Sequence, residues 1–191
     1  MYADQRKRQE LNKTITDIAK YLKALNTKVT IEQACPFNIP RISQLTQKTN
    51  QFNMTTRGYL EEDIKKFAKS DDFLIFSVKV EDKFGDNGIT GAAIIEKKEK
   101  KWIIDLFLLS CRIIGRRVEE IMLAYILEAA KKEKVKILIG EFISTKKNAP
   151  AKEFYHKNGF KLIEEKDGTQ RWKFSVSNEY KYPEFIKIIN K

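Results

Sequence analysis

A thiol, a glycine and three arginines stand close together in the sequence, between an apolar run and a helical pattern: Cys111, Gly115, Arg112, Arg116 and Arg117. A strand that ends, turns at a glycine and opens a helix presents unpaired backbone N–H groups to an anion placed there. A cysteine just before such a turn would lie beside the group to which the anion belongs. The segment therefore predicts chemistry on a phosphate-bearing ligand next to a thiol.

Alternating strands and helices flank this segment and must position it. Periodicity predicts helices at 4–26, from 39, at 61–69, 118–132, 149–158 and 182–189, and strands at 28–32, 73–80, 88–95, 102–109, 135–142, 160–163 and 171–176. The turn signal Asp86–Gly88 favours an antiparallel meander over 73–109, and 111–142 indicates a strand–helix–strand crossover. We expect three parts, namely an N-terminal helix or linker at 1–27, one α/β domain at 28–177 and a C-terminal capping segment at 178–191.

Composition and charge narrow the class of protein. The 191 residues are 42% hydrophobic and 11% aromatic, which suits a globular domain, and no run reaches the roughly 18 apolar residues of a membrane span. The charged N-terminus does not resemble a signal peptide, so we expect a cytoplasmic protein, and Cys35 and Cys111 lack metal-ligand spacing. The formal net charge of +11 suits an acidic partner, but no basic tract has the interleaved aromatics of a nucleic-acid binder. We therefore expect no metal, membrane or nucleic acid as a partner.

The element order and the glycine turn resemble the fold of the GCN5-related (GNAT) acyltransferases. That fold has a mixed central sheet with an antiparallel meander, a glycine turn and a long helix, to which this chain adds an N-terminal helix. Its fingerprint is Arg/Gln-x-x-Gly-x-Gly/Ala, which Arg112 and Gly115 match and from which Arg117 departs. The resemblance implies that this turn binds coenzyme A or the phosphopantetheine of a carrier protein. The residues that it assigns to phosphate binding are Arg112, Ile113, Gly115, Arg116 and Arg117.

A second part of the chain resembles the same fold. Asn148 and the run Phe154–Phe160 (FYHKNGF) match its asparagine and its F-Y-x-x-x-G-F segment. The resemblance implies that Asn148 contacts the pantetheine arm and that Tyr155 is the general acid for a leaving thiolate, since a tyrosine holds its proton at neutral pH. From the residues alone, a core tyrosine at a helix end fits Tyr155 equally well. His156 lies among lysines, which favours a surface position.

A longer match covers nearly the whole chain and resembles the C-terminal region of FkbH-like proteins. The matching residues are Arg41–Asn53, Phe84–Gly88, Asp105, Leu108–Arg112 and Gly115–Arg116. In those proteins this domain follows a phosphatase domain of the haloacid dehalogenase (HAD) superfamily. The resemblance implies that a glyceryl unit is taken from bisphosphoglycerate and loaded on an acyl carrier protein, in polyketide or other secondary-metabolite biosynthesis. Because the phosphatase signature Asp-x-Asp is missing from the sequence, we expect the upstream HAD-type domain to be missing from this chain.

That activity needs a nucleophile that can hold an acyl group, and Cys111 is the candidate. Arg112, Arg116 and the start of a helix would favour its thiolate, which forms a thioester directly. If the preceding strand is regular, Asp105 lies on the same face as Cys111, and in an apolar run it needs a partner such as Arg112 or a substrate hydroxyl. On the residues alone, a small buried hydrophobe is the other interpretation of Cys111.

Four polar residues between the first two helices of the domain are candidates for the small acyl group: Asn50, Gln51, Asn53 and Thr55. Their amides and hydroxyls would hold a polyol, although loop capping explains them equally well. Three functions thus stay open. They are acyl transfer through a Cys111 thioester to a carrier protein, coenzyme A-dependent N-acetyl transfer in which Cys111 is dispensable, and non-catalytic docking of a carrier protein.

Overall fold

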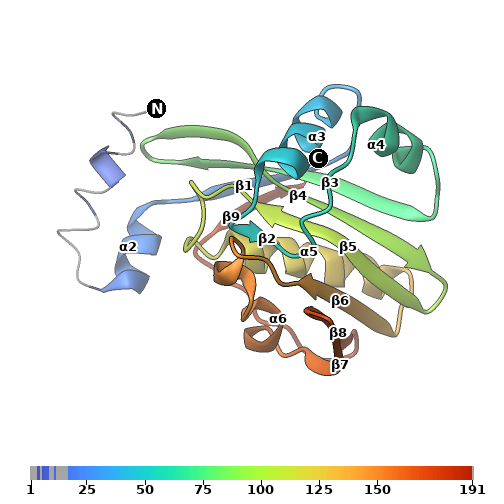
Figure 1. The fold of residues 1–191 in the computed structure, drawn as a ribbon. Coiled ribbons are helices and arrows are strands. Elements are labelled where there is room, and N and C mark those ends of the chain that lie inside the picture. Colours follow the sequence, from blue (N-terminus) through green and yellow to red (C-terminus); the bar gives the residue numbers. More distant parts are fainter. Residues whose placement is uncertain (1–3, 5, 9–10, 12–16, 191) are drawn as a thin grey trace.

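The computed structural model describes residues 4, 6–8, 11 and 17–190, and these form one mixed sheet with helices on both faces (Figure 1). The strands are β1 (Lys28–Gln33), β2 (Phe52–Asn53), β3 (Phe73–Asp82), β4 (Gly85–Lys98), β5 (Lys101–Leu109), β6 (Ile137–Ile143), β7 (Lys161–Lys166), β8 (Thr169–Ser175) and β9 (Lys187–Asn190). The helices are α2 (Ile18–Ala24), α3 (Ile39–Lys48), α4 (Glu61–Ala68), α5 (Val118–Lys132), α6 (Phe154–Lys157) and the 3-10 turn η1 (Ala149–Ala151). No helix in the described part of the chain is long and apolar enough to cross a bilayer.

The sheet has the strand order β7-β8-β6-β5-β4-β3-β1-β9, with β2 paired to β5 beside this path. The strands β3, β4 and β5 pair antiparallel in sequence, which confirms the predicted meander. The strand β6 lies parallel to β5 and follows α5, which confirms the predicted crossover. A parallel pair needs such a long connection, and α5 supplies it.

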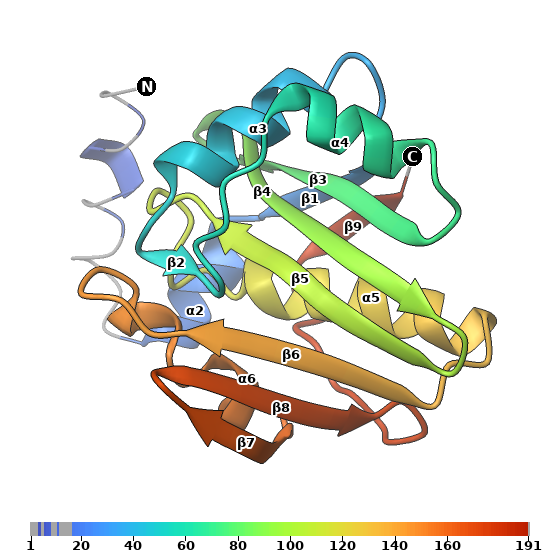
Figure 2. The same cartoon turned by 45° about the vertical axis from the view of Figure 1, so that its right-hand side comes forward.

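The two faces of the sheet bury separate cores. Helices α3 and α4 cover one face, while α5 and α6 cover the other (Figure 2). Ile42, Ile64 and Leu106 are fully buried on the α3–α4 side, and Phe107 and Ile121 are fully buried on the α5 side. The alternation of Leu106 and Phe107 between the two cores follows from the period of two of a strand. The end of β5, from which the chain leads into α5, therefore packs against a core on each face of the sheet.

A β-bulge interrupts β5 at Asp105. Ile94 of β4 pairs with Leu106 and Ile95 pairs with Ile104, so Asp105 is the extra residue. A bulge re-aims a side chain, and here it turns the Asp105 carboxylate toward Tyr59 on the α3–α4 side. The prediction that Asp105 shares a face with Cys111, which assumed a regular strand, is therefore wrong.

The strands β5 and β6 diverge about halfway along their length. They pair from Lys101 to Ile104 opposite Ile137 to Gly140, and beyond that point β5 pairs with β2 instead. Figure 2 shows β2 between the diverging ends of β5 and β6. We call Phe52–Thr55 the bridging segment. The sequence pattern predicted only a polar connection here, because a two-residue strand has no readable period.

The predicted β3–β4 turn at Asp86–Gly88 is wrong by three residues. The strands continue to Asp82 and restart at Gly85, so the turn lies at 83–84. The Asp86 carboxylate accepts a hydrogen bond from the backbone N–H of Gly88, whose φ of 69° is left-handed. This local motif produces an irregular register within β4 and not the hairpin turn itself.

Three predicted helices differ from the structure. The helix at 149–158 is broken into η1 and α6, and Gly159, with φ 80°, ends α6 as predicted for a C-cap. The helix at 182–189 is wrong, because Lys187–Asn190 pairs parallel to the free edge of β1. Of the helix at 4–26, the structure shows α2 with the Asp17 carboxylate capping its first N–H groups, while much of the remainder lies outside the described residues.

Candidate functional site

Cys111 is exposed at the end of β5, at the mouth of a pocket of about 550 Å³. The pocket brings together residues from the end of α3 and the three segments that follow α3, β5 and β6: Lys48, Thr49, Asn50, Gln51, Ser110, Cys111, Lys146 and Lys147. The structure thus places Cys111 with two of the predicted substrate residues, Asn50 and Gln51. Its exposure does not fit the interpretation of Cys111 as a small buried hydrophobe.

Three lysines give this pocket its charge. Lys48 ends α3, and Lys146 and Lys147 follow β6, so the divergence of β5 and β6 brings them to one mouth. None of the three forms an ion pair with a residue in the described part of the chain. Such a set attracts anions, including phosphates and acidic proteins. Sequence analysis missed these lysines because they are spread over elements that only the fold brings together.

Arg116 does not face this pocket. Its side chain is buried and donates to the Asp82 carboxylate, with 2.7 Å between Nη1 and Oδ2. Arg8 binds the same carboxylate through Nε and Nη2 at 2.8 and 2.9 Å. Burial alone would raise the pKa of Asp82, but hydrogen bonds from Arg8 and from the Phe84 backbone N–H, together with the charges of Arg8 and Arg116, lower it below its usual range. Arg116 is therefore a structural ion-pair partner, and the prediction that it binds phosphate or activates Cys111 is wrong.

Two carboxylate side chains, those of Glu119 and Glu120, lie at the start of α5. Arg117 has left-handed φ and ψ at the position where the fingerprint has glycine or alanine, and its guanidinium pairs with Glu120. Burial raises the pKa of Glu119 to about 7, while a hydrogen bond from its own backbone N–H acts in the opposite direction. Both carboxylates line a groove of about 460 Å³ between α5 and α6. Arg117, Lys157 and Lys181 line the same groove, so a phosphate there would meet charges of both signs.

The remaining residues of the predicted phosphate turn have different positions. Ile113 is fully buried in the α5-side core, so it offers only its backbone. Gly115 is exposed with φ 82°, and nothing lies within 4 Å of the position that a Cβ would occupy. Arg112 is half-buried and lies with its Nε 3.4 Å from the Ser110 Oγ, next to the Cys111 pocket.

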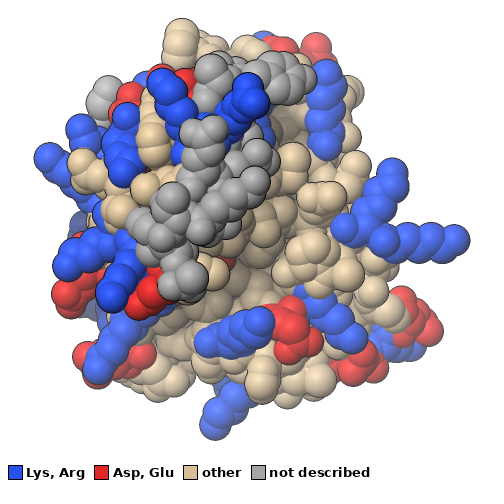
Figure 3. All heavy atoms as spheres, turned by 90° about the vertical axis from the view of Figure 1, so that its left-hand side faces the viewer, with Lys and Arg blue, Asp and Glu red and all other residues tan. Residues whose placement is uncertain are grey.

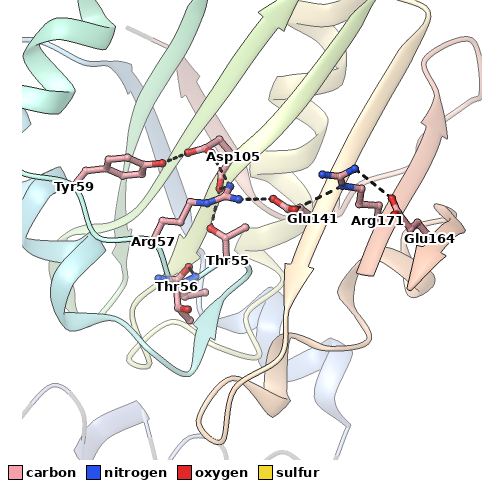
Figure 4. Close-up of polar contacts among 9 residues, drawn as sticks. Thr55, Thr56, Arg57, Tyr59, Asp105, Glu141, Glu164 and Arg171 are labelled. Atoms are coloured by element: carbon pink, nitrogen blue, oxygen red, sulfur yellow. Dashed lines mark hydrogen bonds and ion pairs between the residues drawn. The ribbon is translucent and has the colours of Figure 1, made fainter. Parts of the chain in front are cut away.

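Asp105 belongs to a second cluster, on the sheet face between β5 and β6 (Figure 4). Arg57 joins the two strands, with Nη1 2.7 Å from Asp105 Oδ1 and Nη2 2.7 Å from Glu141 Oε2. The Tyr59 hydroxyl donates to Asp105 Oδ2 at 2.5 Å, and burial and this bond raise the pKa of Tyr59. The partners of Asp105 are therefore Arg57 and Tyr59 and not the predicted Arg112.

Glu141 and Arg57 were missed from the sequence, although one signal was present. Glu141 is a single carboxylate in the apolar run Ile137–Ile143, as Asp105 is in β5. Arg171 on β8 lies 3.7 Å from Glu141 and 3.2 Å from Glu164, which extends the cluster toward the sheet edge (Figure 4). None of these residues lines the Cys111 pocket, so the thiol and the carboxylates form separate sites.

Asn148 is fully buried, and its side-chain N–H groups and oxygen are all hydrogen-bonded within the chain. Its amide donates to the backbone oxygens of Asn53 and Ile143 at 3.0 and 2.9 Å. Its Oδ1 accepts from the Thr145 backbone N–H at 2.8 Å and from the Thr145 hydroxyl at 3.0 Å. An asparagine amide has two donors and one oxygen, so no group is left for a ligand. The prediction that Asn148 contacts a pantetheine arm is wrong.

Two of the predicted substrate residues also shape the chain. The Asn53 amide donates to the Thr49 backbone oxygen, and its Oδ1 accepts from the Thr56 backbone N–H. The Thr55 hydroxyl donates to the Asp105 backbone oxygen at 2.8 Å. Both side chains are buried, so the loop-capping interpretation holds for these two residues.

Tyr155 is fully buried, and its ring packs against the backbone of Gly140 in β6. Burial raises the pKa of its hydroxyl. A general acid must come within hydrogen-bond reach of the atom that it protonates. A tyrosine with no exposed surface lacks that access, so the structure agrees with the core-tyrosine interpretation and not with the predicted acid.

The net charge of +11 does not gather into one patch on the face that carries the N-terminal segment. Figure 3 shows Lys and Arg side chains around the margin of this face, with carboxylates among them and uncharged residues at its centre.

Comparisons with known proteins identify the fold. No protein-family model and no curated protein matches the sequence. Among solved structures, the ribosomal-protein-S18-alanine N-acetyltransferase from Escherichia coli matches with a TM-score of 0.61 and 15% identity, over 79% of this chain and 96% of that one. A putative GNAT-family acetyltransferase from Desulfovibrio desulfuricans gives 0.61 and 12%, over 78% and 99%. A putative acetyltransferase from Salmonella typhimurium, solved with its cofactor acetyl-CoA, gives 0.57 and 12%, over 82% and 98%.

These likenesses show that the chain has the GNAT fold, as its element order and turn predicted. The bridging segment lies between the diverging ends of β5 and β6 and is hydrogen-bonded to both strands. The phosphate position at the start of α5 carries Glu119 and Glu120. The Cys111 pocket keeps exposed polar groups open to a ligand.

Proposed function

We propose that this chain is an acyltransferase that carries a short acyl unit as a thioester on Cys111. The unit is glyceryl from a phosphorylated three-carbon donor, and the acceptor is the phosphopantetheine thiol of an acyl carrier protein. The observation that supports this proposal is the exposed thiol at the mouth of a pocket with Lys48, Lys146 and Lys147. The GNAT fold is consistent with acyl transfer in general.

The chemistry consists of two exchanges at one carbonyl carbon. In the first, the Cys111 thiolate attacks the acyl phosphate, a C–S bond forms, and the C–O bond to phosphate breaks with phosphate as the leaving group. The second phosphate of a bisphosphoglycerate donor stays on the three-carbon unit, so a phosphatase must hydrolyse it to give glyceryl. In the second, the carrier thiolate attacks the thioester, and Cys111 leaves as a thiolate. The three lysines would bind the phosphate and oppose the negative charge that develops at the pocket mouth. The exposed amides of Asn50 and Gln51 would donate to the hydroxyls of the glyceryl unit.

The same lysines suit the proposed partner. Acyl carrier proteins are acidic, so a cationic mouth would steer one toward Cys111 and place its arm there. Lys48, Lys146 and Lys147 would act in docking as well as on the donor.

Intact mass spectrometry tests the covalent step. The chain is incubated with bisphosphoglycerate and then with a holo carrier protein, in parallel with Cys111→Ala and Cys35→Ala. Cys35 is the matched control, because it is the other free cysteine and lies half-buried away from the pocket. We expect one phosphoglyceryl adduct in the native chain and in Cys35→Ala, its transfer to the carrier, and no adduct in Cys111→Ala, because nothing in this incubation removes the second phosphate of the donor. An adduct that survives in Cys111→Ala would refute the covalent role.

A second candidate is coenzyme A-dependent N-acetyl transfer, which the likeness to N-acetyltransferases favours. The Asp105 carboxylate, held by Arg57 and Tyr59, would then face the amine acceptor. Acetyl transfer to an amine that is undiminished in Cys111→Ala would support this candidate over the first. Carrier binding without adduct or turnover would instead indicate a docking module.

A further inference from the structure

The bridging segment is hydrogen-bonded to both strands of the gap. The Met54 N–H donates to the Phe107 oxygen of β5 at 3.1 Å, and the Ile143 N–H of β6 donates to the Met54 oxygen at 2.8 Å. Phe52 and Asn53 pair antiparallel with Leu109 and Leu108 of β5. The backbone groups that β5 would offer to a ligand in the gap are thus already paired within the chain.

The side chains of the segment are part of the core. Met54 is fully buried and Phe52 is 5% exposed. The Phe52 ring contacts the Phe107 and Phe154 rings, with centroids 6.4 and 5.7 Å apart. Removal of the segment would return two large apolar side chains to water and open a void in the α5-side core, both of which oppose displacement.

Polar contacts hold the two ends of the segment. Asn148 donates to the Asn53 backbone oxygen, and the Thr55 hydroxyl donates to the Asp105 backbone oxygen. Two residues further on, Arg57 joins Asp105 of β5 to Glu141 of β6 (Figure 4). A ligand that entered the gap would have to break the Asn148 and Thr55 contacts and separate the Arg57 ion pairs.

We infer that the bridging segment is a permanent internal strand that takes the place of a ligand arm in the gap between β5 and β6. A pantetheine-type thiol therefore reaches Cys111 from the outer pocket of Lys48, Lys146 and Lys147 and does not pass through the sheet. The route of the arm rests on the proposed function, which supplies the pantetheine thiol, whereas the place of the bridging segment in the sheet does not.

Amide hydrogen exchange of the native chain, with and without millimolar acetyl-CoA, tests this route. We expect the Met54 and Ile143 amides to exchange about 100-fold or more slowly than the exposed amides of Gln51 and Lys146. We also expect acetyl-CoA to leave the Met54 and Ile143 rates unchanged. A ligand effect confined to residues 48–51, 110–111 or 146–147 would also support the outer route.

Two results would overturn the inference: fast exchange at Met54 or Ile143 in the free chain, or a loss of their protection when acetyl-CoA is added. Asn148→Ala provides a sensitised version, because it removes a hydrogen bond to the segment. We expect faster exchange at Met54 in that variant. A ligand effect that appears only in Asn148→Ala would show that the intact segment excludes the ligand.

Discussion

Replacement of Asn148 by alanine separates a structural role from a ligand contact. In the structure the amide bridges Asn53 and Ile143, the two sides of the gap, and it also ties down Thr145. The variant would leave the backbone oxygens of Asn53 and Ile143 and the backbone N–H of Thr145 without these partners, the first in a buried contact and the other two in part-buried ones. We therefore expect the free energy of unfolding to fall substantially while the exposed Cys111 pocket keeps its residues.

The size of the loss follows from the number of groups left unpaired. A buried polar group without a partner costs about 1–3 kcal/mol, and water admitted to the vacated volume would offset part of this. For three groups we expect a net loss of about 3–5 kcal/mol. In a domain of this size, each kcal/mol lowers Tm by about 2–4 °C, so Tm should fall by about 6–20 °C.

Thermal and urea unfolding measure the effect, with Asn50→Ala as the control. Asn50 is exposed, and its truncation should change stability by no more than about 0.5 kcal/mol. A Tm for Asn148→Ala within a degree of that for Asn50→Ala would refute the structural role. If such a variant also lost affinity for a pantetheine ligand, Asn148 would be a ligand contact, as the family resemblance implied.

Three further predictions concern buried groups. Asp82→Ala strands two buried arginines and should cost about 3–5 kcal/mol by urea unfolding, whereas Asp86→Ala, in an exposed pair on the same hairpin, should cost less than about 1 kcal/mol. Because the folded pKa of Asp82 is lowered, its stabilisation is present above the unfolded pKa and is lost as pH falls through the folded value, so acid titration of Tm should show this loss only with Asp82 intact. Gly140→Ala places a Cβ into the fully buried Tyr155 ring and should cost about 1–3 kcal/mol by thermal unfolding. The pKa of Glu119 is raised to about 7, so the free energy of unfolding of the native chain should fall by about 1–3 kcal/mol as pH rises from about 4.5 to 7. Unfolding measured over a pH series should show no such fall in Glu119→Gln.

Much of the fold follows from local pattern. The meander, the long helix and the crossover depend on alternating or helical spacing that extends over many residues, and the structure confirms all three. The C-terminal strand Lys187–Asn190 could not be predicted in this way. A four-residue apolar pattern fits a helix or a strand, and the unpaired edge of β1 decides between them.

The candidate site was harder to predict, because its polar residues serve the fold as often as a ligand. Asn53, Thr55 and Asn148 have the residue types of a binding site, yet each bonds a backbone group of a neighbouring element. The β-bulge at Asp105 could not be read from the sequence, and it separates this carboxylate from Cys111. Composition alone does not distinguish an amide that binds a ligand from one that binds the chain.

The turn after Cys111 has the backbone geometry that the sequence predicted, but its arginine side chains bind carboxylates within the chain. Gly115 and Arg117 both have left-handed φ values, so the chain bends there although arginine occupies a position that favours glycine. Arg116 is bound to Asp82 and Arg117 to Glu120, so neither guanidinium faces the thiol. The glycine and arginines of this segment therefore correctly predicted a turn, but Arg116 and Arg117 do not supply the charge that was predicted beside the thiol. The positive charge beside Cys111 comes from Arg112, next to the pocket, and from Lys48, Lys146 and Lys147. The chemistry of the thiol therefore depends on how α3, β5 and β6 meet as well as on the residue that follows it.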